Sequence, residues 1–486
     1  MTKNKIILNW MPPATLNFAS PSLSALKSYL TKFDYEVKIV YWNLKLAELQ
    51  CGFLWLKTPD FYDDEMRSLL LFFNYIAIKR NDTNAYNQVK GILIAIKPQY
   101  LTRDIDVYDL HMKAYADELD CYIDDILSKI DDSNILYYGM SVMFYQWIFS
   151  SILAEKIKIK NQESKIIIGG ISSKESAVAY LESFDQFDFA LWGESEINLE
   201  ILSKELIENN ENIDFDKLLN TAFRKNDKIK ISKHRKCNYI DFSNDKSIFD
   251  ISDYFEQKKI IDEIFNDQIK ERIPIEGARG CHWKKCNFCY LNTGYKYRLK
   301  PVSLIIYEIK KQISKYNVFS FCFLDNDLVG LDKERFKHLL DELIEIKKVY
   351  PNFSIDMAEV ITNGIDSSII RKMFFAGFES VQIGYESPSN SLLKKIRKKN
   401  SFASNLLFIK FAQVYNIGIS GANVIMGLLE ETDNDIIEAI KNLHHLRFFL
   451  LRGRFRHSYT SLGIMHTSSY YDKLENKIEH LSRNQI

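Results

Sequence analysis

The chain has 486 residues, of which 46% are hydrophobic and 26% are charged. This composition is typical of a globular protein, and the length exceeds what one hydrophobic core usually supports, so we expect two or three domains. Lysine plus arginine and aspartate plus glutamate number 64 each. Such a balance gives no sign of a nucleic acid or of an anionic membrane as a partner.

Targeting and membrane signals are absent from the sequence pattern. The first residues, MTKNKIILNWMPP, contain a short apolar run that is broken by Asn9 and two prolines. This pattern favours a first strand over a secretory signal. The longest apolar segment, residues 68–78, is too short to span a bilayer. Seven cysteines without a disulfide framework fit a reducing compartment. We therefore expect a cytoplasmic protein without a membrane partner.

Strands and helices alternate in the first part of the chain. We expect strands at residues 5–10, 36–42, 135–143, 165–168 and 187–192. A helical insertion is expected at about residues 44–130. Alternation of this kind predicts an α/β fold with a parallel, doubly wound sheet, and ligands bind such sheets at the carboxyl ends of the strands. The first predicted domain spans residues 1–209.

Residues 210–271 are more polar and less periodic, and we interpret them as a linker region that contains a hairpin with Asn226 and Asp227 at its turn. A second alternation begins at residue 272. Its strands are expected at residues 273–277, 320–324, 353–360, 380–384 and 419–426, with a sixth candidate at 455–462.

With amphipathic helices between them, these strands predict an open or partial (β/α)6 barrel over residues 272–450. In such barrels the catalytic groups lie on the loops that follow the strands. Residues 451–486 are interpreted as a C-terminal extension.

Three cysteines lie close together in the run EGARGCHWKKCNFCYLNTG, after the first strand of the second domain: Cys281, Cys286 and Cys289. Three thiolates on one loop can hold three irons of a [4Fe–4S] cube and leave the fourth iron open for a substrate or cofactor. Two alternatives stay open at this point. With His282 the cysteines could form a Cys3His zinc knuckle, or they could be unligated thiols.

The second domain resembles the radical S-adenosylmethionine (SAM) enzymes. Their cluster loop normally reads Cys-x3-Cys-x2-Cys, with an aromatic residue before the last cysteine. Phe288 takes the aromatic place here, while the first gap has four residues, as occurs in the cobalamin-dependent branch. The resemblance implies a [4Fe–4S] cluster on the three cysteines and a barrel that binds SAM.

The run FLDND, residues 323–327, ends the second predicted strand with Asp325 and Asp327. It is similar to an acidic pair of this family, which implies that these carboxylates receive the SAM ammonium or line the substrate face. Judged on the residues alone, they could also belong to a surface turn or a helix cap.

GFESVQIGYESPSNSLLKKIRKK, residues 377–399, is similar to the family's strand followed by Gly-x-Glu-Ser. This match implies SAM contacts for Glu386 and Ser387. Asn423 matches an asparagine that lies near the ribose. Glu386 could alternatively be a plain salt-bridge partner.

The first domain resembles the cobalamin-binding domain of the same branch. GMSVMFYQW contains a strand end of the type Ser-x-aliphatic, here Ser141 and Met143, and IIIGGIS contains the glycine pair Gly169 and Gly170. Considered alone, the glycine pair could simply belong to a turn. No Asp-x-His-x-x-Gly motif follows the first strand, so the resemblance implies cobalamin without a protein histidine below the cobalt.

Over about residues 3–450, the chain is most similar to radical enzymes that mature ribosomally made peptides (RiPPs). The resemblance implies that a 5′-deoxyadenosyl radical removes hydrogen from an unactivated carbon, which is then methylated from cobalamin. It also implies a small-molecule or peptide substrate and an electron donor such as flavodoxin or ferredoxin. Two alternatives stay open: a cobalamin-associated radical rearrangement or oxidation without methyl transfer, and a non-catalytic cobalamin- or metal-binding regulatory protein.

Overall fold

The computed structural model describes residues 4–51, 65–96, 105–209, 213–226, 228–233, 239–243, 247–265, 269–290, 296–450, 454–464 and 468–475. The chain divides into two compact units. The first comprises Met1–Ile240 with Ser247–Lys270, and the second comprises Asp241–Lys246 with Glu271–Ile486. Within the described ranges, no helix has the length and hydropathy that a bilayer crossing demands.

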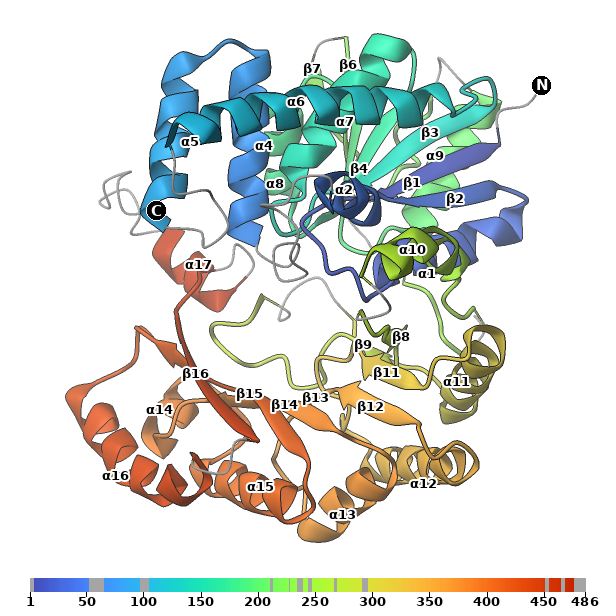
Figure 1. Cartoon of the computed structure of the whole chain (residues 1–486). Coiled ribbons are helices and arrows are strands. Elements are labelled where there is room, and N and C mark those ends of the chain that lie inside the picture. The colour runs from blue at the N-terminus through green and yellow to red at the C-terminus, as the bar shows by residue number, and fades with distance from the viewer. Residues whose placement is uncertain are drawn as a thin grey trace. The chain divides into compact units, whose positions relative to one another are not determined.

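A seven-stranded sheet in the order β2-β1-β3-β4-β5-β6-β7 forms the centre of the first unit (Figure 1). Its strands are β1 Lys5–Trp10, β2 Glu36–Tyr41, β3 Ile135–Ser141, β4 Ile166–Ile171, β5 Phe189–Trp192, β6 Thr221–Lys225 and β7 Lys228–Ile231. The strands from β2 to β5 pair in parallel, whereas β6 and β7 are antiparallel. The strand order reverses between β1 and β3, and this reversal is where doubly wound sheets bind their ligands.

Helices accompany this sheet along the chain. They are α1 Pro21–Leu30, α2 Trp42–Cys51, α4 Glu65–Lys79, α5 Thr83–Ile96, α6 Ile105–Ser128, α7 Trp147–Lys160, α8 Lys174–Ser183, α9 Glu196–Glu208 and α10 Ser252–Phe265. All residues of β3 are buried, as expected for a central strand covered on both faces. α4, α5 and α6 fall within the stretch predicted as a helical insertion.

The segment interpreted as a linker region contributes β6, β7 and α10 to the first unit. The predicted hairpin is formed by β6 and β7, and β6 pairs with β5, so the hairpin extends the main sheet. Elements at the edge of a sheet bury only one side. β7 is mostly exposed and α10 packs on one side only, so their apolar pattern is weak and resembles that of a connecting segment.

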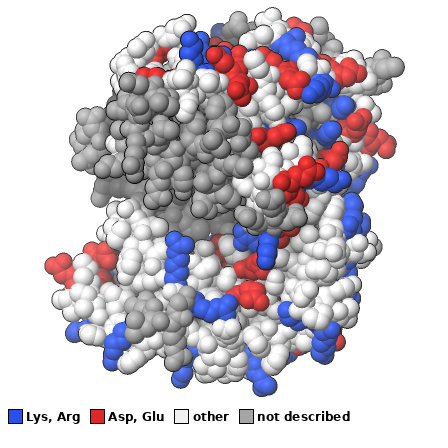
Figure 2. Space-filling view, viewed as in Figure 1, with Lys and Arg blue, Asp and Glu red and all other residues white. Residues whose placement is uncertain are grey.

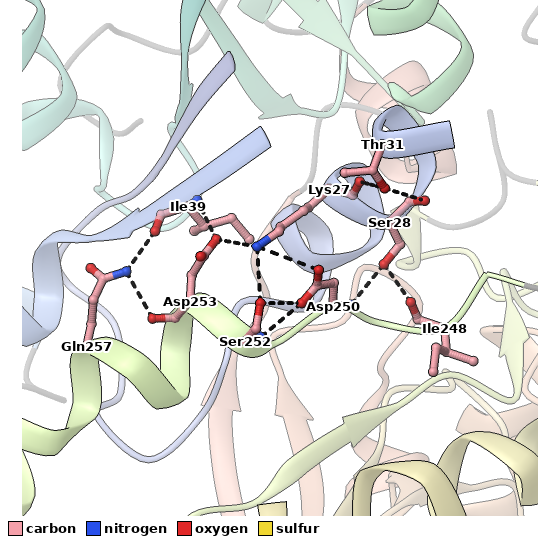
Figure 3. Close-up of polar contacts among 9 residues, drawn as sticks. All are labelled: Lys27, Ser28, Thr31, Ile39, Ile248, Asp250, Ser252, Asp253 and Gln257. Atoms are coloured by element: carbon pink, nitrogen blue, oxygen red, sulfur yellow. Dashed lines mark hydrogen bonds and ion pairs between the residues drawn. The ribbon is translucent and has the colours of Figure 1, made fainter. Parts of the chain in front are cut away.

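α10 covers the edge strand β2 through side chains (Figure 3). Asp253 Oδ2 accepts hydrogen bonds from the Ile39 N–H and from Lys27 Nζ, both at 2.7 Å. Gln257 accepts from the Tyr41 N–H at 3.0 Å and donates to the Ile39 carbonyl at 2.8 Å. Because an edge strand lacks a neighbour on one side, these bonds satisfy backbone groups that would otherwise need water.

The second unit contains two groups of parallel strands, ordered β12-β11-β8 and β13-β14-β15-β16. These strands are β8 Ile273–Ile275, β11 Ser320–Phe323, β12 Ser354–Met357, β13 Glu359–Val360, β14 Ser380–Glu386, β15 Gly418–Met426 and β16 Phe455–Ser461. β12 and β13 fall in one predicted strand that is broken at Ala358. A bridge between Ile355 and Phe378 links the two groups.

Helices follow the barrel strands along the chain (Figure 1). They are α11 Val302–Tyr316, α12 Lys333–Val349, α13 Ser367–Phe375, α14 Asn390–Lys395, α15 Phe402–Val414, α16 Asp433–Leu450 and α17 Ser469–Glu475. A short antiparallel pair, β9 Ala278–Arg279 and β10 Arg298–Leu299, adjoins the end of β8. The predicted combination of a doubly wound sheet and a partial barrel is confirmed.

Charged side chains of both signs are interspersed among the described residues on the face that Figure 2 shows. This distribution agrees with the equal numbers of basic and acidic residues in the chain.

Candidate active site

The loop with the three cysteines follows β8 and β9. Cys286 is buried, and Cys281 and Cys289 are half-buried. Burial raises the pKa of the Cys286 thiol to about 12, and the charges of Cys289 and Cys281 add to this increase, whereas Lys398 lowers the pKa. The three thiols therefore lie within electrostatic reach of one another.

This loop is fastened to the C-terminal end of α14. The Asn287 N–H donates to the Ile396 carbonyl at 3.1 Å, and Asn287 Nδ2 donates to the Lys395 carbonyl at 3.1 Å. Trp283 Nε1 donates to the Arg397 carbonyl at 2.7 Å. Sequence reasoning missed Asn287 and Trp283 as anchors, since their partners lie more than a hundred residues away.

The widened first gap of the cysteine loop has a defined conformation. Lys284 adopts a left-handed backbone (φ 51°), which turns the chain sharply between the first two cysteines. His282 Nδ1 lies 3.0 Å from Asp327 Oδ2, and its Nε2 lies 3.0 Å from Lys399 Nζ. Both ring nitrogens thus face charged side chains, so a Cys3His zinc site would require His282 to give up at least one of these contacts.

Among the described residues, no three or more His, Cys, Asp and Glu side chains converge as they would around a single metal ion. A [4Fe–4S] cube does not require such convergence, because each cysteine binds a different iron. Three thiols grouped on one loop are a donor set that fits this cluster.

Asp325 lies after β11 and is 1% exposed. Its Oδ2 accepts a hydrogen bond from the Gly277 N–H at 2.8 Å, while its Oδ1 has no hydrogen-bond partner among the described residues. Burial raises the pKa of this carboxyl to about 8, and the charge of Glu276 contributes, against the lowering by the Gly277 N–H. A buried carboxylate oxygen without a partner fits a bound ammonium group.

Asp327 is also buried, but its oxygens are already engaged. Oδ1 accepts from the Ile361 N–H at 3.1 Å, and Oδ2 accepts from the Gly330 N–H at 3.2 Å and lies beside His282. The structure therefore separates the predicted acidic pair into one carboxylate with an open oxygen and one that braces the surrounding turns.

Glu386 ends β14 with a left-handed backbone (φ 59°). Its Oε1 lies 2.6 Å from Lys398 Nζ, with side chains 13% and 9% exposed. Although burial lowers the pKa of the Lys398 ammonium, the charges of Glu386 and Cys286 raise it above its ordinary value. Glu386 is thus a salt-bridge partner, which is one of the two roles expected for it. The ion pair lies next to the cysteine loop.

Glu359 on β13 belongs to the same electrostatic group. Burial, together with the charge of Glu386, raises the pKa of its carboxyl to about 7. Sequence reasoning missed Glu359. An acidic residue within a predicted buried strand, here MAEV, was the signal that could have found it.

The other predicted contacts lie on the same strands and loop. Ser387 is 2% exposed, and its Oγ accepts from the Ser389 N–H at 3.0 Å. Asn423 donates to Thr460 Oγ1 at 2.7 Å and thereby connects β15 with β16. Phe288 packs against a buried apolar cluster that includes Leu392, Leu393 and Ile396.

The predicted cobalamin contacts lie at the carboxyl ends of β3 and β4. Ser141 donates to Gln146 Oε1 at 2.6 Å, and Gln146 Nε2 donates to the Met11 and Pro13 carbonyls at 2.9 and 3.3 Å. These bonds connect the loops after β1 and β3, where the strand order reverses. The hydroxyl of Ser141 is therefore engaged within the protein.

Gly170 has a left-handed backbone (φ 86°), and a Cβ there would lie 2.5 Å from Met143 Cγ. At Gly169, in contrast, no described atom beyond its chain neighbours lies within 4 Å of a Cβ built there, so the described part of the chain leaves this position at the end of β4 open. Phe144 and Tyr145 follow Met143 with left-handed backbones and are 69% and 44% exposed. Open backbone beside exposed aromatic rings fits a large, flat ligand.

Residues 275–443 match the family model of the Radical SAM superfamily. The chain therefore contains a radical SAM domain, and the recognition of this family is confirmed. No curated protein matches the chain.

Solved structures match nearly the whole chain in fold. The radical SAM methyltransferase TsrM from Kitasatospora setae, with cobalamin and a [4Fe–4S] cluster bound, has a TM-score of 0.61 and 11% identity, covering 99% of this chain and 79% of that one. OxsB, a cobalamin-dependent SAM radical enzyme with aqua-cobalamin and SAM bound, has a TM-score of 0.58 and 16% identity. The match covers 98% of this chain and 55% of OxsB.

Proposed function

We propose that the protein is a cobalamin-dependent radical SAM methyltransferase that methylates an unactivated carbon. The observation that carries the proposal is the three-cysteine loop after the first barrel strand, with the open oxygen of Asp325 at the end of the next strand. The fold of TsrM and OxsB supports it, because both of those proteins combine SAM chemistry with cobalamin.

Cys281, Cys286 and Cys289 would hold a [4Fe–4S] cluster, and Asp325 would receive the ammonium of SAM, with Asp327 bracing the turn. Phe288 would shield the cluster from water. The bound cluster and SAM would supply a carbon-centred radical that removes hydrogen from the substrate, and cobalamin would supply the methyl group.

The chain's own groups would position and balance these cofactors. Glu386 would contact SAM while it stays paired with Lys398, and the ammonium of Lys398 would offset negative charge on the thiolate ligands. Ser387 and Asn423 would line the adenosine side of the same strands. No residue is assigned as a general acid or base.

Cobalamin would bind the first unit at the carboxyl ends of β3 and β4, beside Ser141, Met143, Gly169 and Gly170. The open position at Gly169 supports this placement. No histidine follows β1 in the manner of proteins that ligate cobalt, so cobalamin would be held here without a histidine ligand from that loop.

The substrate would be a small molecule or a peptide, including the precursor peptides that RiPP maturases modify. A TsrM structure with tryptophan substrate and a SAM analogue bound, at 12% identity and a TM-score of 0.57, supports a small-molecule substrate. Flavodoxin or ferredoxin would supply the electron, and the reaction would take place in the cytoplasm.

Anaerobic purification with cobalamin supplied, followed by iron, sulfide and cobalt analysis, tests the proposal. We expect about four irons per chain, bound cobalt, and 5′-deoxyadenosine after reduction with SAM. Cys286→Ala should lose the iron, whereas Cys322→Ala, which changes a buried cysteine of β11 outside the loop, should keep it. Zinc without iron, or a reduced iron-loaded protein that forms no 5′-deoxyadenosine, would contradict the assignment.

Product mass separates the proposal from its nearest rival. A methyltransferase adds the mass of one methyl group, and a radical rearrangement or oxidation does not. Bound cobalt with no turnover of any peptide or small molecule would favour the regulatory alternative.

A further inference from the structure

His282 is the first residue after Cys281, and its side chain is only 4% exposed. Its Nδ1 lies 3.0 Å from Asp327 Oδ2, and its Nε2 lies 3.0 Å from Lys399 Nζ. The Nδ1 contact has the distance of a hydrogen bond but not its direction, so it is an electrostatic contact. The ring also packs beside Tyr297, with 5.9 Å between the ring centroids.

The partners of His282 determine where its proton lies. A lysine ammonium has only donors, so Nε2 of the imidazole must accept from Lys399. The ring proton of a neutral histidine then lies on Nδ1, next to the carboxylate of Asp327. Nδ1 of His282 thus lies beside the turn after β11.

Asp327 is a fixed point for this contact. Its Oδ1 accepts from the Ile361 N–H and its Oδ2 accepts from the Gly330 N–H, so its carboxylate is held from two other segments. It stands two residues after Asp325, whose Oδ1 is open. The contact with Asp327 therefore holds His282 close to Asp325, where an ammonium group would bind.

The four-residue gap between Cys281 and Cys286 allows this tie. Trp283 is bound to the Arg397 carbonyl, and Lys284 turns the chain with its left-handed backbone. The gap is thus filled by residues with defined contacts on both sides: His282 toward the turn after β11, and Trp283 toward the end of α14.

We propose that His282 is a positioning residue, which fixes Cys281 relative to Asp325 and so sets the distance between the open iron and the SAM ammonium. This inference rests on the proposed function. It assigns the widened gap a role: the additional residue lets the loop reach both anchors.

Two substitutions of His282 test the inference in the full-length, reconstituted protein. His282→Phe keeps a planar ring without donors, whereas His282→Asn keeps a donor close to the Nδ1 position. His338→Phe, at an exposed histidine of α12, is the matched control. The readouts are iron per chain and the electron paramagnetic resonance spectrum of the reduced cluster during titration with SAM.

We expect all variants to retain iron, because the three cysteines are unchanged. H282F should raise the SAM concentration that gives half of the spectral change by about tenfold to a hundredfold, as loss of groups that orient ligands does. For H282N this concentration should stay within about threefold of that of the unmodified protein. H338F should behave as the unmodified protein does.

Asp327→Asn gives a second route to the same answer if H282F folds poorly. It should weaken the SAM response at least as much as H282F does, because Asp327 Oδ2 also accepts from the Gly330 N–H. The double variant H282F/D327N should respond as D327N alone does, because D327N already removes the contact with His282.

A full SAM response in H282F, equal losses in H282F and H282N, or additive losses in the double variant would overturn the role of His282. An unmodified protein that takes up no cluster would instead overturn the proposed function on which this inference rests.

Discussion

Asp325 and Asp327 stand two residues apart and differ in what surrounds their oxygens. The run FLDND predicts an acidic pair at the end of a strand, but it does not reveal the division of roles. That division arises from the N–H groups of Gly330 and Ile361 and from His282, which reach Asp327 and leave Asp325 Oδ1 open. Side-chain partners this distant in sequence cannot be paired by inspection of the chain.

The carboxyl of Asp325 makes the stability of the second unit depend on pH. Its pKa is raised from 3.8 to about 8, so folding favours the protonated form. The associated cost is absent below pH 4 and grows as the pH rises toward 8. Asp325→Asn removes this cost, so we expect its gain in unfolding free energy to be about 2 to 4 kcal/mol larger at pH 8 than at pH 5.

Thermal unfolding of the cofactor-free protein at both pH values measures this difference. Asp341→Asn, at an exposed position of α12, is the control and should show no such pH dependence. An equal effect of D325N at the two pH values would contradict the prediction. The same variant should also lose the response of the cluster to SAM.

The ion pair between Glu386 and Lys398 should contribute strongly to stability because both side chains are mostly buried. Lys398→Met leaves Glu386 buried without its partner, which we expect to cost about 3 kcal/mol and to lower the unfolding midpoint by about 6–12 °C. Lys372→Met breaks an exposed pair with Asp341 and should cost about 0–1 kcal/mol. Similar midpoints for the two variants would show that burial of the Glu386 pair has no such effect.

At the scale of elements, the strands and helices with strong periodicity were predictable, and so was the hairpin of β6 and β7, whereas α10 was not. The sequence pattern located β14 because its apolar residues alternate, and β1 and β11 because they form short apolar runs. α10 was hidden within a polar segment, since it is amphipathic and packs on one side only. Its main contribution is made by polar side chains that bond to the backbone of β2 (Figure 3).

Asp253→Ala tests the role of α10 at this edge. The change removes the acceptor of the Ile39 N–H and leaves Lys27 buried with weaker contacts to Asp250 and Ser252. We expect a loss of about 3 kcal/mol and faster amide hydrogen exchange in a peptide that covers β2. Glu256→Ala, at an exposed neighbouring position of the same helix, should leave exchange in β2 unchanged.

At the scale of the whole molecule, the chain consists of two α/β units with separate candidate cofactor sites. Alternation of strands and helices predicted both units, and the cysteine spacing predicted the chemistry of the second. The open end of β4 at Gly169 could not be predicted, because a glycine pair in a sequence does not show whether space or a neighbour lies beside it. The contrast between Gly169 and Gly170 appears only in three dimensions.

This separation predicts that the two cofactors can be lost independently. Gly169→Val fills the open position at the end of β4, so we expect bound cobalt to fall about tenfold or more while iron per chain is unchanged. Cys286→Ala should give the opposite result. Gly463→Val, at an equally open glycine in the second unit, is the control and should retain both metals. Full cobalt binding by G169V would place the corrin elsewhere.

Both edges of the seven-stranded sheet are protected, and this bears on the fate of a newly made chain. α10 occupies the side of β2, and the opposite edge strand, β7, carries the lysines Lys228 and Lys230. Unprotected edge strands pair with other copies and aggregate, whereas covering helices and lysines prevent such pairing. We therefore expect the newly made chain to stay dispersed in solution before any cofactor binds.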